Sequence, residues 1–157
     1  MYRRILLAFD GSPSGHEALH QGADLARLYG AQVMLVAVVA PDAGIVMAES
    51  AAPSGLPAFQ FEDTERVLKE GALELRRSGL TVQTSLCQGN PALEIGRVAR
   101  EWVADLIVVG HREQSTLARW WRGSTGASLL AHSPCSLLVA VIDQAPRRDS
   151  ASASKPA

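Results

Sequence analysis

Short, almost wholly apolar segments alternate with segments of helical periodicity along this chain of 157 residues. The first two apolar segments, Arg3–Asp10 and Ala31–Ala40, read RRILLAFD and AQVMLVAVVA. A strand that is apolar at successive positions is buried on both faces, which is typical of a parallel sheet covered by helices. This alternation constrains the fold more than any other feature of the sequence, and it predicts an α/β domain.

The segment between these two strands carries the start and stop signals of a complete helix. Ser12 and Pro13 suit the N-cap and the first helical position, and Gly30 suits the end of the helix. The small and apolar residues between them recur at helical spacing: Ala18, Gly22, Leu25 and Tyr29. We therefore expect a helix that packs on the sheet through this face.

The rest of the chain repeats the alternation. The expected elements are a helix from about Glu62 to Ser78, a strand over Leu80–Gly89, a helix after the cap Asn90, a strand over Ala104–Gly110, a helix over Gly123–His132 and a strand over Cys135–Ile142. Right-handed crossovers then predict an open doubly wound five-stranded parallel sheet with helices on both faces, a Rossmann-like α/β fold. Ligands of such sheets bind beyond the carboxyl ends of the strands. The strand ends to inspect are Asp10, Val38, Val39, Gly89 and Gly110.

Two stretches lie outside this pattern. Pro41–Phe59 is rich in Ala, Pro, Gly and Ser and is long for a loop, so it is interpreted as a lid, a partner surface or a partly disordered segment. Residues 144–157 lack apolar periodicity and are expected to be disordered. The sequence thus predicts one domain over residues 1–143 and a disordered tail over residues 144–157.

The composition argues against several classes of protein. A formal net charge of -1 gives no electrostatic footprint for nucleic acid, and no apolar run approaches the length of a membrane span. The apolar stretch before Asp10 is too short for a signal peptide. Cys87 and Cys135 match no metal spacing and are expected to be reduced thiols. We expect a cytoplasmic protein without a nucleic-acid or membrane partner.

The segment from Val108 to Ala140 has the layout of a phosphate cradle. Gly110 ends an apolar strand, where a glycine allows the backbone to bend and to approach a ligand closely. Gly123, Ser124 and Thr125 then open a helix, whose first backbone N–H groups form an anion site. The same residues also fit a plain turn at Gly110 and an ordinary N-cap at Ser124, and the spacing alone does not separate these interpretations.

Three segments together resemble the universal stress protein family. They read ILLAFDGS, GNPALEI and VVGHREQSTLARWWRGSTGASLLAHSPCSLLVA, and the resemblance extends from Arg3 to Ile142. Many members bind ATP through a glycine, two residues, a glycine, nine residues and a glycine followed by Ser or Thr. Gly110 matches the first glycine and Gly123 with Ser124 matches the last pair, whereas Glu113 occupies the position of the middle glycine. This departure places a carboxylate where the resemblance implies phosphate.

The resemblance also implies roles for residues at the strand ends. It implies a ribose or adenine contact for Asp10, an adenine seat at the backbone of Val38 and Val39, and a close approach to the base at Gly89. The residues it assigns to the nucleotide site are Asp10, Val38, Val39, Gly89, Val109, Gly110, Glu113, Gly123, Ser124 and Thr125, and the ligand is ATP, with Mg²⁺ as its counter-ion. Asp10 before Gly11 equally fits a turn-forming aspartate.

One motif points to a different chemistry. His16–His20 reads HEALH and matches the H-E-x-x-H helix motif of zinc proteases. A catalytic zinc needs a third ligand, and no further histidine follows nearby. Because Ala18, Gly22 and Leu25 are expected to face the sheet, both histidines should turn toward solvent. We therefore reject a protease and leave a weak surface metal site open.

Three functions remain. The first is a stress-response binding module for ATP or a related adenine nucleotide, with binding weakened by Glu113. The second is a nucleotide-independent interaction module whose cradle is empty because of Glu113. The third is a slow ATP hydrolase, which needs an oriented water and an acid that holds a metal, and only Glu113 or Asp10 could supply that acid. It ranks last because no general base is identifiable.

Two features predict protein partners. The last apolar strand, Cys135–Ile142, is expected to be a sheet edge that pairs with its copy in a homodimer, since an open apolar edge invites aggregation. Trp120 and Trp121, beside Arg119 and Arg122, also fit a nucleic-acid surface, but such a cluster is more often a lid over the site or a contact with a protein, here a regulatory partner.

Overall fold

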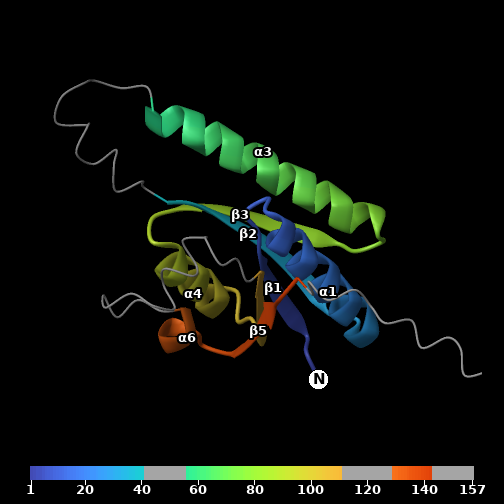
Figure 1. The fold of residues 1–157 in the computed structure, drawn as a ribbon. Coiled ribbons are helices and arrows are strands. Elements are labelled where there is room, and N and C mark those ends of the chain that lie inside the picture. The colour runs from blue at the N-terminus through green and yellow to red at the C-terminus, as the bar shows by residue number, and fades with distance from the viewer. Residues whose placement is uncertain (41–55, 111–128, 143–157) are drawn as a thin grey trace, which may run out of the picture.

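The computed structural model describes residues 1–40, 56–110 and 129–142 (Figure 1). Their strands form one parallel five-stranded sheet with the order β3-β2-β1-β4-β5. The strands are β1 (Arg4–Ala8), β2 (Gln32–Val39), β3 (Val82–Gln88), β4 (Leu106–Gly110) and β5 (Ser136–Ala140). The predicted α/β fold with an open doubly wound sheet is confirmed.

Helices cover both faces of this sheet, as Figure 1 shows. The described helices are α1 (Pro13–Tyr29), α3 (Leu56–Arg77), α4 (Pro91–Glu101) and α6 (Leu129–His132). Helices α1 and α3 lie on one face, and α4 and α6 lie on the other. None of them is both long enough and apolar enough to cross a membrane, within the residues described.

The core is split into two layers by the alternation of side chains along each strand. In β1 and just after it, Ile5, Leu7 and Phe9 pack under α1 and α3, whereas Leu6 packs under α4. All four side chains are buried. This double burial explains why the strand is apolar at successive positions.

The predicted helix signals are confirmed by hydrogen bonds. The Ser12 hydroxyl accepts a hydrogen bond from the Gly15 N–H at 3.0 Å, and Gly30 ends α1 with φ of 63°. The Asn90 side chain accepts from the N–H of Ala92 at 3.0 Å and so caps α4. These caps place the first turns of α1 and α4 directly after the carboxyl ends of β1 and β3.

The beginning of α3 differs from the prediction. The helix starts at Leu56 and not near Glu62, so the last four residues of the expected loop Pro41–Phe59 are helical. Pro57 lies in the first turn, where backbone N–H groups have no partner within the helix, so the N–H that proline lacks is not needed there. The Pro- and Ala-rich composition had suggested a loop, but a proline at this position is compatible with a helix start.

Other expected elements are narrower or only partly described. The last strand covers Ser136–Ala140 within the expected Cys135–Ile142. The helix expected over Gly123–His132 is described from Leu129 onward. The remainder of the long loop, residues 41–55, and the tail, residues 144–157, lie outside the described residues.

Candidate functional site

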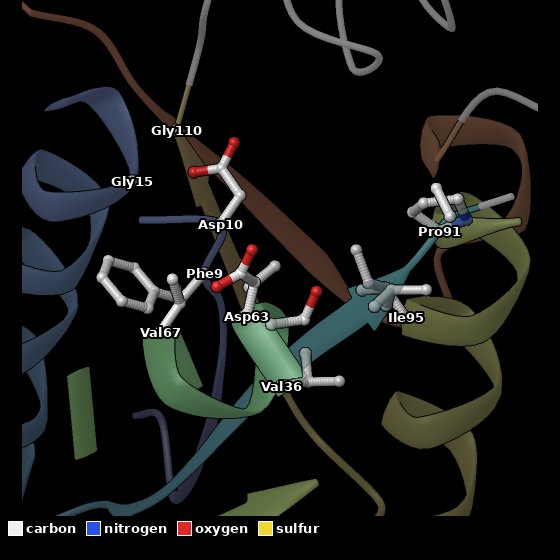
Figure 2. A pocket seen from close by; sticks show the side chains of 13 residues that line it. Phe9, Asp10, Gly15, Val36, Asp63, Val67, Pro91, Ile95 and Gly110 are labelled. Atoms are coloured by element: carbon white, nitrogen blue, oxygen red, sulfur yellow. The ribbon is translucent and has the colours of Figure 1, made fainter. Parts of the chain in front are cut away.

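The candidate site lies where the order of the strands reverses. From β1 the chain proceeds outward to β2 and β3, and it then returns to β4 on the other side of β1. A cavity of about 290 Å³ opens at the carboxyl ends of β1, β2 and β4 (Figure 2). Its lining residues are Ala8, Phe9, Asp10, Gly15, Val36, Val38, Ala40, Asp63, Thr64, Val67, Pro91, Ile95 and Gly110. This is the position at which open α/β sheets bind ligands.

Asp10 both organises a turn and lines the cavity. Its Oδ1 accepts hydrogen bonds from the Ser12 N–H at 2.9 Å and from the Ser12 hydroxyl at 2.5 Å. Ser12 in turn caps α1 through the Gly15 N–H. The turn-forming role of Asp10 is thus present in the structure, and its exposed carboxylate also faces the cavity.

Gly110 is required by the packing of α1 before any ligand is considered. A Cβ at this position would lie 2.2 Å from the Ser14 carbonyl oxygen and 2.7 Å from the Gly15 nitrogen. Gly15 is similarly constrained, since its Cβ would lie 2.6 Å from the Asp10 carboxylate. The two glycines let the first turn of α1 rest on the end of β4 and bring both segments to the cavity wall.

The sequence-predicted site residues divide into three groups. Asp10, Val38 and Gly110 line the cavity together. Three others do not line it, because Val39 and Val109 are buried in the core and Gly89 forms a turn after β3 with φ of 138°. The remaining residues lie outside the described residues: Glu113, Gly123, Ser124 and Thr125.

Two helices contribute residues that sequence reasoning missed. Asp63, Thr64 and Val67 come from α3, and Pro91 and Ile95 come from α4. Figure 2 shows Asp63 and Val67 across the cavity from Pro91 and Ile95. No local motif marks these positions. The available signal was the four-residue spacing of Asp63 and Val67, which places them on one helix face.

The wall formed by the described residues is apolar with a negative rim. Asp10 and Asp63 are the charged residues among them, and no lysine, arginine or histidine of the described segments lines the cavity. Asp63 pairs with Arg66 at 2.8 Å, and this hydrogen bond is the main cause that raises the pKa of the Arg66 guanidinium. Such a wall suits an apolar ring that carries hydrogen-bond donors.

The two histidines of the HEALH motif contact a carboxylate from the neighbouring helix. His16 Nδ1 lies 3.2 Å from Glu74 Oε2, and His20 Nε2 lies 2.8 Å from Glu74 Oε1. Both histidines are partly exposed, as expected from the burial of Ala18 and Gly22. Within the described ranges, no three His, Cys, Asp or Glu side chains are placed to hold a metal ion.

Cys135 lies just before β5, away from the cavity-lining residues. Partial burial raises the pKa of its thiol, and the charge of Asp105 adds to this effect. Because the thiolate is the nucleophilic form, the environment of Cys135 does not activate it.

Comparison with known proteins agrees with this architecture. A model of the universal stress protein family matches residues 1–140. A crystal structure of a member of that family from Burkholderia pseudomallei is 30% identical, with a TM-score of 0.66, and the match covers 88% of this chain and 95% of the other.

Two further structures share the fold at lower identity. A universal stress protein in complex with cAMP is 23% identical, with a TM-score of 0.63 over 88% of this chain and 96% of its own. A universal stress protein from Archaeoglobus fulgidus in complex with dAMP is 20% identical, with a TM-score of 0.59 over 88% of this chain and 98% of its own.

Proposed function

Because the chain belongs to the universal stress protein family, we propose that it is a stress-response regulatory protein that binds ATP or a related adenine nucleotide. The observation that carries this proposal is the cavity at the reversal of strand order, which brings Asp10, Val38 and Gly110 together. Two proteins of the same fold hold the adenine nucleotides cAMP and dAMP. The two cysteines of this chain, Cys87 and Cys135, are free thiols, which is consistent with the proposal that the protein acts in the reducing cytoplasm.

The cavity suits the nucleoside end of such a ligand. Its volume of about 290 Å³ lies just below the range of roughly 300–1,000 Å³ for small-molecule sites. Val38, Val67 and Ile95 offer apolar contacts for a purine ring. Asp10 offers an acceptor for a ribose hydroxyl. The phosphates would leave past Gly110 toward Gly123, Ser124 and Thr125, where the sequence predicts an anion-binding helix start.

Glu113 opposes this arrangement on electrostatic grounds. Two unit charges about 5 Å apart at an effective dielectric near 20 repel by roughly 3 kcal/mol, and solvent screening reduces this severalfold. Arg112, Arg119 and Arg122 lie near Glu113 in the sequence, and their positive charges are able to neutralise an anion or to pair with Glu113. We therefore propose that Glu113 weakens the binding of ATP but does not abolish it. Mg²⁺ would supply a further compensating charge.

Glu113→Gly is expected to tighten the binding of magnesium ATP by about tenfold, which corresponds to relief of about 1.4 kcal/mol. Calorimetric titration of both proteins measures this change, and titration with GTP under the same conditions serves as the control for the base. Weaker binding by the variant would mean that Glu113 assists the nucleotide, through a metal ion or a hydrogen bond.

Glu113 also favours a second candidate function, an interaction module that works without nucleotide. In that case the original protein would bind no ATP, whereas Glu113→Gly would gain ATP binding because it removes the carboxylate that keeps the cradle empty. Mass analysis of small molecules released when the purified protein is denatured separates the two functions, since the first predicts a released adenine nucleotide at substoichiometric or higher amounts.

We further propose that β5 pairs with its copy in a homodimer. Strand β5 is an edge of the sheet, next to β4 alone among the described strands. Val141 and Ile142 follow it and are 58% and 42% exposed, whereas Val139 packs against the core layer under α4. A symmetric partner would cover both the edge and these apolar side chains.

Val141→Lys is expected to shift the protein from dimer to monomer, because it places a charge in the proposed interface without touching the core. Sedimentation velocity at micromolar concentration measures the ratio of the two species. Gln83→Lys, at an exposed position of the opposite edge strand β3, is the matched control and should leave the ratio unchanged. A monomer in the original protein would reject the dimer.

A further inference from the structure

Asp63 is a second carboxylate on the cavity that carries the proposed function. It comes from α3, whereas Asp10 follows β1, so two separate elements bring acidic side chains to one cavity. Figure 2 shows both carboxylates on the side opposite Pro91 and Ile95. The hydroxyl-bearing Thr64 lines the cavity beside Asp63.

Each carboxylate uses one oxygen to hold its own element in place. Asp10 Oδ1 accepts the two hydrogen bonds from Ser12. Asp63 Oδ1 accepts a hydrogen bond from Arg66 Nη2 at 2.8 Å. Within the described residues, the second oxygen of each side chain, Oδ2, receives no such bond, so the cavity wall has two acceptor oxygens available to a ligand.

The chemistry of the nucleotide selects the part that these oxygens can bind. An ionised carboxylate only accepts hydrogen bonds. Phosphate oxygens and purine ring nitrogens are also acceptors, so they do not pair with it. The 6-amino group of adenine and the vicinal 2′- and 3′-hydroxyls of ribose each supply two donors. The hydroxyls are two separate groups, which matches two acceptor oxygens that lie on separate side chains.

We propose that Asp63 acts with Asp10 to bind the ribose diol, and that Asp63 thereby makes this protein selective for ribonucleotides over deoxyribonucleotides. This inference rests on the proposed nucleotide function. The fold itself does not impose the selection, because one structure of this fold holds dAMP, which lacks the 2′-hydroxyl. The selectivity would come from residues of this chain.

The ion pair with Arg66 positions Asp63 for this role. Arg66 also reaches Glu70 at 3.5 Å, one turn further along α3 and outside the cavity lining. The side chains of Asp63 and Arg66 are 45% and 63% exposed, so the solvent weakens the interaction, and the expected effect on ligand affinity is about tenfold.

The test is a calorimetric titration with AMP, 2′-deoxy-AMP and 3′-deoxy-AMP. The original protein should bind AMP about tenfold more tightly than 2′-deoxy-AMP, and a preference over 3′-deoxy-AMP alone would overturn the selectivity for ribonucleotides. In Asp63→Ala, the affinity for AMP should fall by about tenfold while the affinity for 2′-deoxy-AMP is unchanged, so the selectivity disappears. Glu70→Gln removes the other partner of Arg66 and is the matched control, which should retain the selectivity.

The possible results separate this inference from the proposed function. If AMP binds and Asp63→Ala keeps the preference for the ribose form, the role of Asp63 is overturned and the nucleotide function stands. If Asp63→Ala instead weakens the binding of AMP but not the binding of an AMP analogue without the 6-amino group, Asp63 contacts the base. The ribose role is then again overturned. If none of the three nucleotides binds, both proposals fail. Thermal unfolding confirms that each variant is folded.

Discussion

Gly110→Ala is expected to lower the free energy of unfolding by about 3 kcal/mol, at the upper end of the usual cost of overpacking. The new methyl group would lie 2.2 Å from the Ser14 carbonyl oxygen and 2.3 Å from its carbon. These are backbone atoms in the first turn of α1, so the helix itself must move. Denaturant unfolding followed by circular dichroism measures the loss.

Gly22→Ala is the matched control for this effect. Its methyl group would also meet an atom at 2.2 Å, but that atom is Leu7 Cδ2, at the end of a side chain that can change rotamer. Alanine also favours the helix over glycine by about 0.8–1 kcal/mol, which offsets part of the cost. We expect a loss below about 1 kcal/mol. Equal losses in both variants would show that α1 does not rest on the end of β4 as described.

Val38→Trp is expected to weaken the binding of ATP by about a hundredfold or more, equivalent to about 2.7 kcal/mol. The half-buried Val38 lines the cavity near the end of β2, and an indole at this position would occupy the space proposed for the purine. Competition of ATP against a fluorescent adenine nucleotide measures the loss. The fold should persist, because the added bulk enters the cavity and not the core.

Val38→Ala is the opposite change and should alter the affinity for ATP less than about threefold, since it removes apolar contact without blocking the cavity. If Val38→Trp binds ATP normally while its thermal unfolding is unchanged, the purine lies elsewhere. This result would contradict the site and leave the fold intact.

The fold was predictable because its signals are local. Strands that are apolar at successive positions, the caps Ser12 and Asn90, and the terminal Gly30 each act within a few residues of the chain. The start of α3 was not predictable in this way. Its Pro- and Ala-rich first turn has a composition shared by loops and helix starts, and only the position of Pro57 distinguishes the two.

The candidate site was predictable where strands end and not where helices pass over them. Asp10, Val38 and Gly110 meet because the carboxyl ends of parallel strands share one edge of the sheet. Asp63 and Ile95 meet them because of how α3 and α4 cross that edge, which depends on packing between distant segments.

Two expectations about individual residues illustrate the same limit. Val109 precedes Gly110 in the sequence, but its side chain points into the core because side chains alternate along a strand. Gly110 was interpreted as a residue that lets a ligand approach. The structure adds the contact with Ser14, a residue almost a hundred positions away that no local pattern connects to it.

The most direct test of the account is to map the amides that respond to ATP by nuclear magnetic resonance. Assigned spectra recorded during a titration should show the largest shifts at Asp10, Gly15, Val38, Asp63 and Gly110, which line one cavity but come from four separate parts of the chain. Amides at the opposite end of the sheet, such as those of Arg3 and Asp105, should shift little. Shifts concentrated away from the cavity, or no shifts at millimolar ATP, would contradict the central claim that this cavity binds an adenine nucleotide.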